Sequence, residues 1–250
     1  MNSGRQTMIP VSQTANLPAG AARALLDQLV RYRLLVPEAI PRLALGVPSD
    51  QSVAAAEPAK LMSPLVRARL VGVASLYLDQ HYYFLAPRAL RMLGNELPEL
   101  PERWCGPLPE TAKIVSYAIL AVCVLSEHRR VRLTRRDLQQ HFPELQRRGL
   151  SLNYYVDASA SPPRLGFVRV DTGGRGRWDR VLARACQDWR DHEAQAGFRR
   201  FIERGQFEIT VVTALPQKAD RISDAISSAK QPLSVRACAV PQLLHLLVPD

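Results

Sequence analysis

The stretch Leu150–Gly174, LSLNYYVDASASPPRLGFVRVDTGG, decides how the second half of the chain folds. It contains two runs with strand character, joined by a turn rich in serine and proline. Asp157 follows the first run, and Asp171 follows the second. Because alternate side chains of a strand point to the same face, Arg169 and Asp171 are expected on one face. The stretch therefore predicts a strand pair that carries acids at its ends and an arginine close to one of them.

Three interpretations of these residues are open. In the first, Asp157 and Asp171, with Glu110 as a third group, are the catalytic residues of a nuclease and hold Mg²⁺ or Mn²⁺, since divalent cations take clustered oxygen ligands. In the second, the site has lost its activity and Arg169 forms a salt bridge with Asp157 or Asp171. In the third, both acids are ordinary strand ends. No cofactor is expected beyond the metal ion of the first interpretation.

Helical and strand patterns alternate through the rest of this half. Thr134 is expected to cap one of the helices. Strands that alternate with helices indicate a mixed sheet covered by helices. The predicted helices are 110–126, 135–142, 178–191 and 218–229, and the predicted strands are 150–156, 165–170, 207–213 and 233–240.

The first half predicts helices followed by a hairpin. Apolar residues recur every three to four positions over 21–36, which indicates an amphipathic helix that Pro37 ends. The aromatic run 76–85, LYLDQHYYFL, breaks at Asp79-Gln80 and predicts a β-hairpin whose aromatic side chains mostly cover a core. The remaining predicted segments are a helix at 38–45, a loop at 46–58, a helix at 65–74 that begins after Ser63-Pro64, and a helix at 87–94.

Three helices followed by a hairpin form the order of a winged helix-turn-helix, in which the third helix enters the major groove. The outward face of that third helix carries Arg67 and Arg69. A small helical bundle with a hairpin is the alternative interpretation of the same pattern.

The segments between these patterns suggest the domain boundaries. Residues 1–16 are polar and are expected to form a flexible arm, and residues 95–109 contain four prolines and are expected to form a linker. The predicted domains are thus a winged helix over 17–94 and an α/β domain over 110–250.

The longest apolar run is too short for a bilayer, and the N-terminus lacks the order of a signal peptide, so we expect a cytoplasmic protein without a membrane partner.

Charge points to a polyanionic partner. The chain has a formal net charge of +10, and all but four of its 33 basic residues are arginines. Arginine matches phosphate oxygens with a planar fork, which favours double-stranded DNA as the partner. The four cysteines are isolated from one another, which excludes a zinc-ligand pattern and a disulfide framework.

Arginines cluster in two places of the second half. Seven lie within residues 129–148, and two more lie in the glycine-rich segment 173–177. Phosphates attract such clusters, although a solvated helix face and a flexible turn are the alternatives. The residues predicted to bind DNA are Arg67, Arg69, Arg129, Arg130, Arg132, Arg135, Arg136, Arg175 and Arg177.

The order of these patterns resembles the replication-relaxation family, which is related to MobC-type plasmid relaxases. The resemblance covers roughly residues 17–247. It rests on Asp157-Ala158, on Arg169-Val170-Asp171-Thr172-Gly173, on Tyr83-Phe84-Leu85 running to Gly94, and on Val212-Thr213. It implies a restriction-endonuclease-like mixed-sheet α/β domain after the winged helix, and a fold class of α+β to α/β. Arg169 stands where the family has a glutamate, which implies impaired cleavage.

We therefore expect a DNA-binding protein of a plasmid or mobile element that acts in replication, transfer or transcriptional regulation. The alternative is an active metal-dependent nickase or relaxase that uses Asp157 and Asp171, with a tyrosine as nucleophile. A third class is a protein-interaction module with a basic surface. The sequence leaves open whether the chain forms a homodimer or contacts relaxosome or replication proteins.

Overall fold

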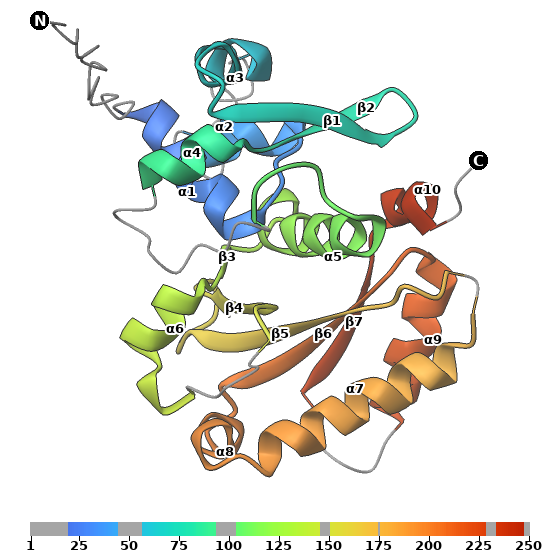
Figure 1. The fold of residues 1–250 in the computed structure, drawn as a ribbon. Helices are drawn as coiled ribbons and strands as arrows, with labels where there is room; N and C mark the ends of the chain where they lie inside the picture. The colour runs from blue at the N-terminus through green and yellow to red at the C-terminus, as the bar shows by residue number, and fades with distance from the viewer. Residues whose placement is uncertain are drawn as a thin grey trace, which may run out of the picture.

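The computed structural model describes residues 20–44, 57–93, 104–145, 151–174, 176–228 and 234–247. It is a mixed α/β protein with a two-stranded hairpin and a five-stranded mixed sheet (Figure 1). Several predicted features lie outside the described residues. They are the arm, residues 46–56 of the predicted loop, residues 95–103 of the predicted linker, and Arg147, Arg148 and Arg175. Within these ranges, no helix has both the length and the apolar character to cross a bilayer.

The N-terminal part consists of short helices and the hairpin. In chain order these are α1 (Ala21–Tyr32), η1 (Pro37–Ala39), α2 (Ile40–Ala44), α3 (Pro58–Arg67), β1 (Val71–Tyr77), β2 (Gln80–Leu85) and α4 (Pro87–Leu93). The predicted apolar face of α1 is confirmed, because Leu25 and Leu29 are fully buried. After α1, Leu35 pairs with Tyr83 of β2 through two backbone hydrogen bonds of 3.1 and 2.8 Å. The hairpin thus gains a short third segment from between the first two helices.

The helix predicted at 65–74 is placed differently. α3 begins at Pro58 and ends at Arg67, so Ser63-Pro64 lie inside it rather than at its start. Pro58 fits the first helical turn, where a backbone N–H is not needed. Beyond α3 the backbone turns at Arg69, which has a left-handed φ of 56°, and the following residues pair with β2. Arg67 therefore ends the helix, and Arg69 lies in the turn after it.

The sheet keeps its strands in chain order. They are β3 (Arg130–Arg132), β4 (Tyr154–Asp157), β5 (Arg164–Val170), β6 (Phe207–Thr213) and β7 (Val235–Ala239). β3 and β5 both pair with β4 antiparallel, whereas β5, β6 and β7 are parallel. The four predicted strands are confirmed within a few residues. β3 was not predicted, because its three residues lie within a run of arginines.

Helices cover both faces of the sheet (Figure 1). Two helices lie on the side of the N-terminal part. They are α5 (Glu110–Leu120), which the π-helical turn η4 (Ala121–Leu125) continues, and α10 (Leu244–Leu247), which follows η6 (Pro241–Leu243). The opposite face carries α7 (Trp178–Glu193), α8 (Ala196–Glu203) and α9 (Pro216–Ser227), while α6 (Arg135–His141) and η5 (Pro143–Leu145) lie beside β3 and β4. Alternation along β5 assigns Val168 to the core under α5 and Phe167 to the core over α7.

The core on the α5 side extends without a break from α1 to the sheet. Trp104 donates a hydrogen bond of 2.9 Å from its indole N–H to the Val30 carbonyl, and Tyr82 accepts one of 2.8 Å from the Leu108 N–H. Tyr77 of the hairpin stacks on His245 of α10, with ring centroids 5.0 Å apart. The N-terminal part is thus packed onto the α/β part by apolar and polar contacts.

Candidate nucleic-acid interface

The two acids predicted to share a metal ion lie at opposite ends of β5. Asp157 pairs in register with Arg164, the first residue of β5, whereas Asp171 follows the last residue of that strand. Asp171 lies seven positions after Arg164, which corresponds to roughly 23 Å at the rise of a strand. The prediction of a common site is therefore wrong. The prediction fails because β4 and β5 are antiparallel. The C-terminal ends of these two strands therefore point in opposite directions, and the acids that follow them lie far apart.

Each of the predicted acids has a partner of its own. Buried Asp157 accepts a hydrogen bond of 2.8 Å from Arg130 Nε and one of 3.0 Å from the Ser159 N–H. Buried Asp171 pairs with Lys218 of α9. Exposed Glu110 pairs with Lys113 at 2.7 Å. Among the described residues there is no group of three or more His, Cys, Asp or Glu side chains that could hold a metal ion, so the residues present do not fit the metal site of a nuclease.

Arg169 also differs from its predicted pairing. It forms a two-point ion pair with Asp188 of α7, and not with Asp157 or Asp171. The expectation that Arg169 and Asp171 share a face is confirmed, because their partners lie on α7 and α9, which cover the same face of the sheet. Both charges thus fasten helices to the sheet.

Asp157 is the counter-ion of a buried arginine. Burial on its own would raise the pKa of Asp157, but the hydrogen bonds from Ser159 and Arg130 outweigh it, and the pKa lies below its ordinary value. The carboxylate therefore stays charged. Its chemistry here is ion pairing with Arg130 at 2.8 Å.

Arg130 and Arg132 were predicted to bind DNA, and the structure places both inside, with exposed fractions of 6% and 4%. Arg132 donates hydrogen bonds to the carbonyl oxygens of Leu152 and Tyr32, at 3.1 and 3.2 Å, and burial lowers its pKa to about 10. The reason is strand alternation: β3 directs its two arginines inward and Val131 outward. A DNA contact through these two residues is therefore excluded in this fold.

The other predicted arginines of this half reach the surface. Arg129, Arg135 and Arg136 are exposed. Arg177 is exposed too and pairs with Asp179. The arginine cluster thus keeps three of its five described members at the surface.

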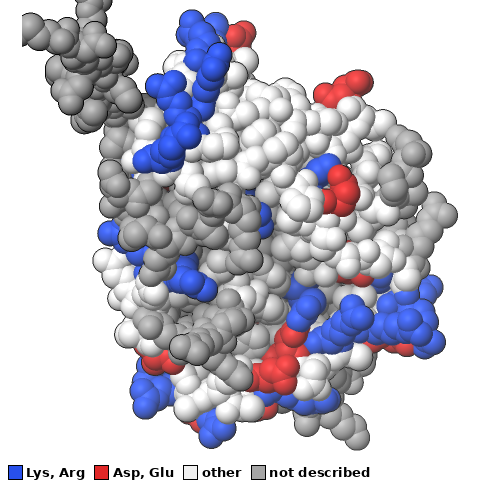
Figure 2. All heavy atoms as spheres, in the orientation of Figure 1, with Lys and Arg blue, Asp and Glu red and all other residues white. Residues whose placement is uncertain are grey.

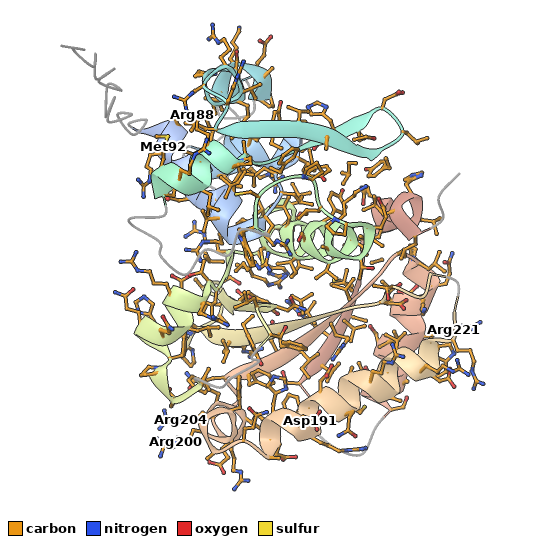
Figure 3. The ribbon with its side chains drawn as sticks, viewed as in Figure 1. Arg88, Met92, Asp191, Arg200, Arg204 and Arg221 are labelled. Atoms are coloured by element: carbon orange, nitrogen blue, oxygen red, sulfur yellow. The ribbon has the colours of Figure 1, made fainter. Side chains whose placement is uncertain are left out.

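Four arginines of the N-terminal part form a basic surface on α3, the turn after it and α4. They are Arg67, Arg69, Arg88 and Arg91, all exposed, and we call them the α3–α4 arginine surface. Figure 2 shows the basic side chains that gather over these two helices, and Figure 3 shows Arg88 directed outward from α4. Within the described ranges, these four side chains have no acidic partner. No acid of the described residues therefore neutralises their charge.

Arg88 and Arg91 were missed at the level of sequence. Their spacing of three places both on one side of a helix, and this signal was present in the sequence. The spacing alone did not predict a DNA-binding surface, because nothing in the sequence indicated that the start of α4 lies beside the turn at Arg69.

The aromatic side chains of the hairpin belong to the core. Tyr82, Tyr83 and Phe84 are buried, with exposed fractions of 1%, 6% and 9%, as expected. The hairpin tip instead exposes Leu78. Base stacking on Tyr82, Tyr83 and Phe84 is therefore not available in this fold.

Comparisons of the chain with family models, with curated proteins and with solved structures find no match.

Proposed function

We propose that this protein binds double-stranded DNA through the α3–α4 arginine surface. The observation that carries the proposal is the presence of four neighbouring, exposed arginines that have no acidic partner among the residues the structure describes. Guanidinium groups in this state attract phosphate, and each phosphate contact releases counter-ions from the duplex. The net charge of +10 adds attraction at longer range.

The arrangement of the N-terminal part supports a winged-helix interpretation. The elements follow one another in the order that this interpretation requires: α1, the segment at Leu35, α2, α3 and the hairpin. In helix-turn-helix proteins the recognition helix reads bases mainly with its N-terminal residues. Here Arg67 is at the C-terminal end of α3 and Arg69 is beyond it. We therefore assign these arginines to phosphate contacts, which position the protein without reading sequence.

The α/β part agrees with a restriction-endonuclease-like domain in having a mixed sheet between two helical layers. Its acids are engaged in internal ion pairs, which favours a role in scaffolding or DNA binding over cleavage. On the resemblance to the replication-relaxation family, we place the protein on plasmid or mobile-element DNA, in replication, transfer or transcriptional regulation.

A salt titration of the wild-type chain tests the proposal. The binding of a short labelled duplex, followed by fluorescence anisotropy, should weaken linearly on a log–log plot with a slope of about −3.6 for four phosphate contacts. Duplexes of unrelated sequence should give similar affinities, because the contacts go to the backbone. An affinity that does not depend on salt, or no binding at low salt, would contradict the proposal.

A further inference from the structure

An open crevice of about 470 Å³ lies between the first turns of α7 and α9. Because α7 follows β5 and α9 follows β6, the crevice lies at the carboxyl ends of two parallel strands. The side chains that line the crevice include Arg177, Trp178, Asp179, Gln217 and Arg221.

The mouth of the crevice carries a surplus of positive charge. Arg221 is exposed and has no ion-pair partner in the part of the chain that the structure describes. Beyond the residues that line the crevice, Arg180 and Arg184 are exposed on α7, three and seven positions after Arg177. Figure 2 shows basic side chains gathered at this end of the molecule, where Figure 3 labels Arg221.

The base of the crevice is electrically neutral. Lys218 lines it, but its ammonium group is buried and donates to the Asp171 carboxylate and, at 3.1 Å, to the Gly174 carbonyl. Lys218 is therefore occupied in holding α9 to the end of β5. The cations that remain for a ligand are the arginines at the mouth.

Asp179 lies where an anionic ligand would lie. Its carboxylate pairs with Arg177, with Nε at 3.0 Å, at the start of α7. A phosphate would take the same arginine and the backbone donors of a first helical turn. The side chain of Arg177 is 70% exposed and that of Asp179 is 41% exposed. Exchange of this carboxylate for a ligand anion therefore costs little.

We propose that this crevice binds a nucleotide through its phosphate group, with Arg177, Arg221 and the first turn of α7 as its donors. The half-buried Trp178 offers an aromatic surface to the base, and the volume suits a ligand of about one nucleotide in size. The phosphate belongs either to a free mononucleotide or to the 5′ end of a nucleic acid strand. This site is separate from the α3–α4 arginine surface.

Calorimetric titration of the full chain tests the need for phosphate. Adenosine 5′-monophosphate should bind at least about tenfold more tightly than adenosine, since the loss of charge-assisted hydrogen bonds has that effect. Equal binding of the two compounds, or no binding of either, would overturn the proposal. A 5′-phosphorylated single strand that binds more tightly than both its 5′-hydroxyl form and the mononucleotide identifies a strand end as the ligand. If the phosphorylated and hydroxyl strands bind equally while the mononucleotide binds, the ligand is a free nucleotide.

Variants test the assignment of the residues. Arg177→Ala with Arg221→Ala should weaken mononucleotide binding at least about tenfold, whereas Asp179→Asn should strengthen it by removing the competing carboxylate. Arg200→Ala with Arg204→Ala, at exposed positions in α8 and directly after it, is the matched control and should change nothing. Unchanged binding in the first variant, or weaker binding in Asp179→Asn, would overturn the assignment.

The nucleotide site and the duplex surface can fail independently. A variant with Arg88→Ala and Arg91→Ala should lose duplex affinity and keep its affinity for the mononucleotide. If it lost both, the mononucleotide would bind at the α3–α4 arginine surface, and the crevice proposal would be wrong.

Discussion

The backbone N–H of Ala86 donates a hydrogen bond of 3.0 Å to the carbonyl oxygen of Leu70. This bond joins the turn after α3 to the start of α4. It makes neighbours of Arg69 and Arg88, which are 19 positions apart in the sequence. The α3–α4 arginine surface is therefore a product of tertiary structure, and it depends on the pairing of β1 with β2 that brings the two segments together.

The buried pair of Arg130 and Asp157 should be essential for stability. Asp157→Ala leaves the Arg130 guanidinium buried without its counter-ion, and we expect a loss of about 3–5 kcal/mol in the free energy of unfolding. Urea denaturation measures it. The control is Glu110→Ala, which removes the exposed partner of Lys113 and should cost no more than about 1 kcal/mol. Similar small losses in both variants would show that Asp157 does not have this structural role.

Gly166 should tolerate no side chain while Tyr155 is present. The Tyr155 ring crosses β5 at this glycine, and its hydroxyl lies 2.6 Å from Thr210 Oγ1. A Cβ at position 166 would lie 2.0 Å from Cζ of Tyr155. We expect Gly166→Ala to destabilise the fold by about 1–3 kcal/mol.

A double-mutant cycle with Tyr155→Ala tests the cause of that loss. If the clash with the ring is responsible, Gly166→Ala should cost little in the Tyr155→Ala background. An equal cost of Gly166→Ala in both backgrounds would rule out the ring as the cause.

Stability should fall in mild acid because of His192. Burial lowers the pKa of His192, and both ring nitrogens are engaged, with Nδ1–H donating to the Asp188 carbonyl and Nε2 lying 2.7 Å from the Tyr154 hydroxyl. The unfolded chain has the ordinary pKa of about 6.5, so as the pH falls below that value the unfolded state binds a proton before the folded state does. The stability that neutral His192 provides is thus present above about pH 6.5 and declines below it.

Urea unfolding at about pH 7.5 and about pH 5.5 measures this decline. His192→Gln should reduce the difference between the two conditions, whereas the exposed control His141→Gln should leave it unchanged. Equal pH dependence in wild type and His192→Gln would contradict the assignment.

Sequence patterns predicted the individual elements better than their pairing. The strand over Phe207–Thr213 was predicted with its observed bounds, and Thr134 caps α6 in a capping box with Asp137, as its position before the helix indicated. These features depend on neighbours within a few residues. By contrast, the distance between Asp157 and Asp171 depends on the antiparallel pairing of β4 with β5, which the sequence does not display.

The arginines show the same distinction. The run from Arg129 to Arg136 is equally basic along its length, yet β3 turns Arg130 and Arg132 inward because the sheet places buried carbonyl oxygens and Asp157 beside them. Such partners come from distant parts of the chain. A local pattern of charge therefore predicted a basic cluster but not which of its members reach solvent.

The most direct test of the DNA-binding account is the duplex affinity of a variant with Arg67→Ala, Arg69→Ala, Arg88→Ala and Arg91→Ala, measured by anisotropy beside wild type and the Arg200→Ala, Arg204→Ala control. All six positions are exposed, so both variants should fold. We expect the fourfold variant to bind at least about tenfold more weakly, with a salt slope shallower by about 3.6, and the control to stay close to wild type. Equal losses in the two variants, or none in the first, would contradict the account.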